Sequence, residues 1–133
     1  MKVEIAAPRD RFEPGHVKVA PGNRHLICRE KLLIHDDGPK VDNQKPSVNR
    51  LFETAAKSYG NHLVGVLLTG MGTDGGAGCL KITQSGGHTV VQNEETSLIY
   101  GMPKAAIQMG GASTVLALDE IASYLITLVG KNG

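Results

Sequence analysis

The amino-acid sequence predicts an α/β protein with a layered, mostly parallel sheet. From Pro46 onward, strand-length apolar segments alternate with segments of helical periodicity, and short connections join them. The segment 63–68 lacks polar alternation, which is typical of a parallel strand buried on both faces. Repeated β-α-β units take right-handed crossovers, so we expect a sheet with helices packed on it.

Residues 1–45 instead contain short strand patterns separated by turns. Clusters of Gly, Pro, Asn and Asp separate four expected strands, at 3–6, 16–20, 26–29 and 32–35. Residues 29–31 suit the tip of an antiparallel hairpin between the last two of these strands.

The remaining elements follow from periodicity and capping residues. Ser47 is a suitable N-cap for a helix that has apolar residues on one face and ends at Gly60. A glycine-rich loop follows the strand at 63–68. The other expected elements are helices at 75–84, 103–109 and 119–129 and strands at 88–92 and 114–118.

Length and composition exclude several classes of protein. The 133 residues fit one domain or a large part of one, and the net charge of +1 gives no sign of a nucleic-acid or membrane-surface partner. No apolar run approaches the length of a membrane span, and we find no export signal. Cys28 and Cys79 lie among apolar residues, so we expect buried, reduced thiols in a cytoplasmic protein.

The most informative segment is 67–78, in which Asp74 follows a buried strand among several glycines. An acid held near a helix start is expected to stay ionised, and such a carboxylate can orient a catalytic imidazole. The alternative is that Asp74 only caps the helix that follows it. The residues alone leave both interpretations open.

The same loop fits a dinucleotide-binding pattern, with Gly70, Gly72 and Gly75 after a strand and Glu94 about twenty residues later. Asp74 argues against this alternative, because its charge would repel a pyrophosphate.

A second loop, 92–104, leaves the next strand at the same expected edge of the sheet. Its Asn93, Glu94, Gly101 and Met102 could line the same cleft. Ser113 lacks the flanking glycine pattern of a nucleophile elbow. Each of the five histidines is expected at the surface or at a strand end, and no metal site or cofactor is expected. They are His16, His25, His35, His62 and His88.

Together these segments resemble the catalytic domain of the chemotaxis receptor methylesterase, a protein-glutamate methylesterase. The resemblance covers about residues 3–129. It rests on the following segments: Pro14-Gly15, Val19-Ala20-Pro21-Gly22-Asn23-Arg24-His25, Pro46-Ser47-Val48, Leu51-Phe52, Leu68-Thr69-Gly70-Met71-Gly72-Thr73-Asp74-Gly75, Gln92-Asn93-Glu94, Gly101-Met102-Pro103, Ala106 and Met109-Gly110-Gly111.

The resemblance implies a doubly wound, three-layer α/β/α fold with a short antiparallel hairpin. It also implies hydrolysis of glutamyl methyl esters, and deamidation of glutamines, on methyl-accepting chemotaxis receptors by a Ser/His/Asp triad without a cofactor. Asp74 matches the triad aspartate. The loop Gly70, Met71, Gly72 and Thr73 would lie near the oxyanion position.

The family's serine and histidine have no counterparts here, and Asn49 stands where the family often has Asp. We therefore expect residues 1–133 to be one partial catalytic domain, incomplete at its N-terminal side, without a receiver domain and inactive alone. Such a domain would expose surface through which copies associate. A natural short relative that binds receptors or another partner without catalysis is the alternative.

Overall fold

The computed structural model describes residues 1–130, which begin with five short strands in two small sheets. These strands are β1 (Lys2–Ile5), β2 (Arg9–Arg11), β3 (His16–Val19), β4 (His25–Arg29) and β5 (Leu32–Asp36). β1 pairs with β3 in parallel, while β5 lies antiparallel between β2 and β4. The β4–β5 hairpin turns through Glu30 and Lys31, both with positive φ. This is the hairpin that the sequence predicted.

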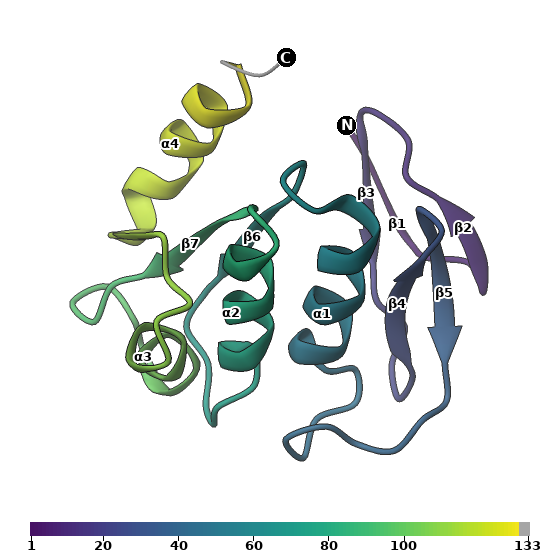
Figure 1. The fold of residues 1–133 in the computed structure, drawn as a ribbon, viewed down its shortest axis with the longest axis horizontal. Coiled ribbons are helices and arrows are strands. Elements are labelled where there is room, and N and C mark those ends of the chain that lie inside the picture. The colour runs from purple at the N-terminus through teal and green to yellow at the C-terminus, as the bar shows by residue number, and fades with distance from the viewer. Residues whose placement is uncertain (131–133) are drawn as a thin grey trace.

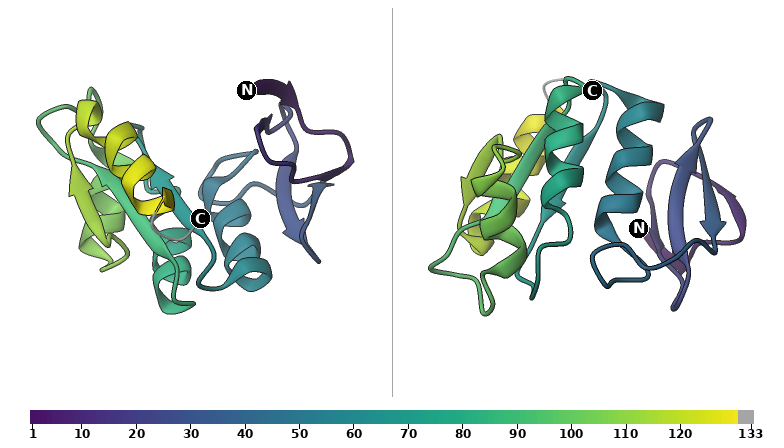
Figure 2. Two further views of the ribbon diagram at one scale, coloured as in Figure 1. Left: turned by 90° about the horizontal axis from the view of Figure 1, so that it is seen from above. Right: turned by 60° about the horizontal axis from the view of Figure 1, so that its bottom comes forward.

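An α/β unit follows, and it contains a parallel sheet in the order β6-β7-β8. Its strands are β6 (Val64–Leu67), β7 (His88–Gln92) and β8 (Thr114–Leu116), and its helices are α1 (Val48–Tyr59), α2 (Gly76–Gln84), α3 (Gly101–Gln108) and α4 (Leu118–Gly130). α2 and α3 cover one face of this sheet, and α4 lies on the other (Figure 1, Figure 2). The central strand β7 is consequently buried over most of its length.

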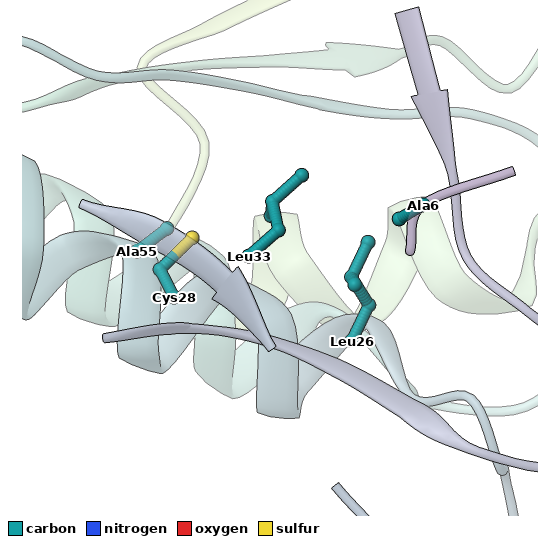
Figure 3. Packing of buried hydrophobic residues seen from close by; sticks show 5 residues of the cluster. All are labelled: Ala6, Leu26, Cys28, Leu33 and Ala55. Carbon is teal, nitrogen blue, oxygen red and sulfur yellow. The ribbon is translucent and has the colours of Figure 1, made fainter. Parts of the chain in front are cut away.

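Helix α1 joins the two halves of the molecule, since it packs against β4 on one side and α2 on the other (Figure 1). One core cluster lies between the N-terminal strands and α1 and contains Ala6, Leu26, Cys28, Leu33 and Ala55 (Figure 3). The second lies between the parallel sheet and its helices and contains Leu67, Cys79, Val91 and Ala106. Val48 and Phe52 of α1 pack against this second cluster, so α1 contributes to both.

The face formed by β1 and β3 exposes apolar side chains. Val3 pairs with Val17 and Ile5 with Val19, so the four side chains lie on one face of the pair. They are 65, 39, 68 and 45% exposed, respectively. On the other face, Lys18 forms ion pairs with Glu4 and Asp10. An apolar face of this kind is unusual on the surface of a monomer.

The expected fold class is confirmed, since the chain is α/β. Among the described residues, β1–β3, β6–β7 and β7–β8 are parallel pairs, and β4–β5 is the predicted antiparallel hairpin. Several details differ from expectation. The strand β2 was not predicted, and the parallel strands form two separate sheets rather than one. The helix α3 begins at Gly101 rather than Pro103, and β8 ends at Leu116 rather than Leu118. Arg9–Arg11 shows no apolar alternation, because β2 is an edge strand whose side chains stay near solvent. None of the helices in residues 1–130 has the length and apolar character needed to cross a bilayer.

Both cysteines are free and buried within these cores. Burial in apolar surroundings disfavours the thiolate, which raises the pKa of Cys28 to about 11 and that of Cys79 to about 12. The Cys28 side chain is only 5% exposed and that of Cys79 is fully buried, so neither thiol is as accessible as a reactive cysteine.

We predict that both thiols resist a thiol-specific reagent such as DTNB at pH 8 in the native state. The raised pKa values leave about a hundredfold less thiolate at Cys28 and about a thousandfold less at Cys79 than an ordinary cysteine has, and burial slows access further. Unfolding in urea should restore rapid reaction of both. Single Cys28→Ser and Cys79→Ser variants assign the two rates, and a fast native reaction at Cys79 would contradict the packing described here.

Candidate functional site

The carboxylate of Asp74 lies against the N-terminus of α1, the helix that precedes it in sequence. Oδ1 accepts hydrogen bonds from the Ser47 hydroxyl at 2.8 Å and from the Asn49 backbone N–H at 3.0 Å. Oδ2 accepts one from the Val48 N–H at 2.7 Å. Asp74 is only 2% exposed. It thus satisfies backbone donors of the first turn of α1, where the helix dipole favours negative charge.

The alternative that Asp74 only caps the helix that follows is wrong. The N-cap of α2 is Gly75, which has no side chain to accept a hydrogen bond. Asn49 of α1 supplies the acceptor instead: its Oδ1 receives the backbone N–H groups of Gly75 at 2.9 Å and Gly78 at 2.8 Å. The amide nitrogen of Asn49 donates to Asp42 at 2.7 Å. Two neighbouring helices therefore cap each other through Asp74 and Asn49.

A serine and a histidine accompany Asp74 in this cluster, but they do not form a catalytic relay. The Ser47 hydroxyl donates directly to Asp74 and accepts from the Arg50 N–H, as the predicted N-cap of α1. Nδ1 of His25 accepts the Ser47 backbone N–H at 3.1 Å, so the proton must reside on Nε2, which donates to the Pro39 carbonyl at 2.8 Å. Both nitrogens of His25 are occupied by backbone groups, and neither contacts the hydroxyl.

His25 lies at the start of β4, which agrees with the strand-end expectation, but it is fully buried and not at the surface. No local pattern indicates this role of His25, because its partners Ser47 and Pro39 are distant along the chain.

The loop 70–73 lies beside the second predicted loop. The backbone of Gly70 donates to Ile99 and accepts from Met102. Gly101 lies so close that an added Cβ would come within 2.8 Å of the Gly72 carbonyl, which explains the requirement for glycine there. Within residues 1–130, neither the Met71 nor the Gly72 backbone N–H donates a hydrogen bond. Gly70 and Gly72 therefore lie against Gly101 and Met102.

Asn93 and Glu94 stand at the carboxyl end of β7, but their side chains have different surroundings. Oδ1 of Asn93 accepts hydrogen bonds from the backbone and hydroxyl of Thr96, which stabilises its own turn. Glu94 is exposed. Gln92, the first residue of the predicted second loop, connects the two loops: Oε1 accepts the Thr69 N–H and Nε2 donates to the Thr96 carbonyl.

The dinucleotide alternative does not fit this geometry. A pyrophosphate would need the free N–H groups at the start of α2, and Asn49 already occupies those of Gly75 and Gly78. In the part of the chain that the structure describes, no three His, Cys, Asp or Glu side chains cluster closely enough to hold a metal ion.

Comparison with known proteins shows which family this chain is similar to. The family described as CheB methylesterase matches residues 1–125. Proteins named protein-glutamate methylesterase/protein-glutamine glutaminase from Anaeromyxobacter dehalogenans and Salmonella typhimurium are 46% and 41% identical over 95% and 97% of this chain. The chain spans only 37% and 38% of their lengths. The crystal structure of the Thermotoga maritima CheB methylesterase catalytic domain superposes with a TM-score of 0.90 at 35% identity, over 94% of this chain and 68% of that one.

We predict that Asn49→Ala lowers the free energy of unfolding by about 2–4 kcal/mol, because two buried N–H groups lose their acceptor. Urea denaturation followed by circular dichroism measures this change. The matched control is Asn61→Ala at an exposed position, where we expect a change within about 0.5 kcal/mol. Equal stability of the two variants would mean that Asn49 does not cap α2 in solution.

Proposed function

Because the chain belongs to the CheB methylesterase family, we propose that it forms part of a protein-glutamate methylesterase domain and supplies its triad aspartate, Asp74. The family match across residues 1–125 is the observation that supports this proposal most directly. The position of Asp74 adds to it, since ligands of open α/β sheets bind at the carboxyl ends of the strands and Asp74 follows β6 there.

The proposed reaction is hydrolysis of a glutamyl methyl ester. A serine hydroxyl attacks the ester carbonyl while a histidine accepts its proton and passes it to the departing methanol; water then releases the glutamate. Asp74 holds the imidazole and stabilises its protonated form. Oδ2 of Asp74 accepts one hydrogen bond while Oδ1 accepts two, so we assign the histidine N–H to Oδ2.

The remaining parts of the proposed site are the two loops. The unpaired backbone N–H groups of Met71 and Gly72 support an oxyanion role for the loop Gly70–Thr73. Gly101 and Met102 would form the adjoining wall of the cleft, and Asn93 and Glu94 its outer rim.

We propose that residues 1–133 are a partial catalytic domain and are inactive without the serine and histidine of the family. The buried cluster at Asp74 supports this, because His25 has both ring nitrogens engaged and so cannot act as the base. The proposed substrate and partner is the cytoplasmic signalling domain of a methyl-accepting chemotaxis receptor, which places the reaction in the cytoplasm. Glutamine deamidation on the same receptor is the proposed second reaction.

Methanol release from a methylated receptor fragment tests this function. We expect none from the 133-residue chain. We expect turnover from a protein extended upstream of Met1 to include a Ser-Thr-Gly-Gly loop and the second-strand histidine. In the extended protein, Asp74→Asn should lower kcat by about ten-thousand-fold, because the imidazole loses its orienting carboxylate.

The matched control is Asp119→Asn, an exposed acid in the first turn of α4 that should leave kcat unchanged. Activity of the short chain that depends on Asp74 would show that a serine and histidine within it are catalytic. An extended protein that folds, binds the receptor fragment and releases no methanol would favour the non-catalytic, partner-binding alternative.

We further propose that copies of this chain associate through the exposed apolar face of β1 and β3. Sedimentation velocity should show a dimer or larger species whose population rises with concentration. Ile5→Lys with Val19→Lys should shift it to monomer, because charge on this face opposes apolar contact. Leu98→Lys, at a side chain 90% exposed in a loop, is the control and should leave the distribution unchanged. A wild-type chain that stays monomeric at high concentration would refute the association.

A further inference from the structure

A cleft lies between the β4–β5 hairpin and the outward face of α1, separate from the Asp74 cluster. It has a volume of about 630 Å³, within the range of ligand-binding sites. Its lining comprises Ile27, Cys28, Arg29, Glu30 and Lys31 from the hairpin and Arg50, Thr54, Lys57 and Ser58 from the helix. The helical wall from Arg50 to Ser58 spans about 12 Å at 1.5 Å per residue. The cleft is therefore long enough to accommodate several consecutive residues of an extended or helical segment.

Three contacts between the hairpin and α1 fix the walls of this cleft. The Cys28 backbone N–H donates to the Thr54 hydroxyl at 3.0 Å, and the Tyr59 hydroxyl donates to the Lys31 carbonyl at 3.4 Å. Arg50 pairs with Asp36 of β5 at 3.4 Å. A cleft with walls held in this way needs little rearrangement to accept a ligand.

The lining is strongly basic although the whole chain is nearly neutral. It contains four basic residues and one acidic residue, while the net charge of the chain is +1. Arg29, Lys31 and Lys57 are exposed and form no ion pair within residues 1–130. Only Arg50 has a carboxylate partner there. Positive charge is thus concentrated on both walls and left without neutralising partners, which attracts anionic groups.

The distribution of these charges indicates the class of ligand. The cations are spread along the two walls, an arrangement that suits several carboxylates along a chain better than one compact anion. The lining has no aromatic side chain on which a base could stack, and the pI of about 7.8 is below the range typical of nucleic-acid-binding domains.

We propose that this cleft binds an acidic segment of a partner polypeptide, with its carboxylates against Arg29, Lys31 and Lys57. Arg pairs with carboxylates bidentately, and Lys pairs as a point charge. Arg50 stays with Asp36 and closes the end of the cleft nearest Ser47. Binding at this cleft does not depend on catalysis, so it can be tested apart from the proposed methylesterase function.

Fluorescence anisotropy of a fluorescein-labelled oligoglutamate peptide, titrated with the 133-residue chain at low ionic strength, tests the proposal. We expect saturable binding that weakens at an ionic strength of about 0.5 M, where charges are strongly screened. An oligoglutamine peptide of the same length should not bind. Arg29→Glu with Lys57→Glu should weaken binding by about tenfold or more, because attraction becomes repulsion on both walls.

The matched control is Lys81→Glu with Lys104→Glu, at exposed positions of α2 and α3 that make the same change in net charge. A change of less than about twofold there supports a local site. Lys31→Asn is a second cleft variant that should keep the fold, since Asn tolerates the φ of 64° at this position. It should weaken peptide binding about threefold.

Three results would overturn the proposal. The first is no binding by the wild-type chain, and the second is equal weakening in the cleft and control variants. The third is tighter binding of an oligothymidylate than of the oligoglutamate, which would make the cleft a nucleic-acid site.

Discussion

The mutual capping of α1 and α2 is the constraint on which the rest of the structure depends. Two helices that start side by side bring two sets of unpaired N–H groups, and two positive dipole ends, into one buried place. Asp74 satisfies the first set and Asn49 the second. Asp74, which caps α1, lies just before α2, and Asn49, which caps α2, is part of α1. If either helix shifted, backbone N–H groups at the starts of both helices would lose their acceptors. The exchange thereby fixes α1, the start of α2 and the end of β6 relative to one another.

Of the two interpretations of Asp74 that the sequence left open, capping of the following helix is wrong, because the carboxylate caps α1. Capping α1 and orienting an imidazole are compatible, because the backbone donors hold the carboxylate in one orientation and Oδ2 retains acceptor capacity. A carboxylate that must orient another group has to be held rigidly itself. Burial at 2% exposure and the Ser47 hydroxyl bond provide that rigidity. The structural role therefore supports the proposed catalytic role.

The sequence predicted the helices and strands well because their signals are local. Ser47 and Gly60 stand at the two ends of α1, and the apolar character of 63–68 indicated the strand β6. The expected burial on both faces is wrong, because β6 is an edge strand whose burial alternates along the chain. The contacts of Asn49, His25 and Gln92 were not predicted, because each involves a residue more than twenty positions away. The separation of β3 from β6 is likewise invisible to periodicity, which describes the faces of a strand but not its neighbours.

Helix α1 also determines how the proposed basic cleft and the Asp74 cluster relate. Its first turn holds Asp74, its outward face forms one wall of the cleft, and Ala55 belongs to the N-terminal core. A ligand in the cleft would change the environment of Asp74 only if α1 could take up two positions in the fold and the ligand favoured one of them. The mutual caps oppose such a second position, since moving α1 would leave buried donors unpaired at both helix ends. The cleft therefore acts as a site of attachment, and the geometry of Asp74 stays the same whether or not the cleft is occupied.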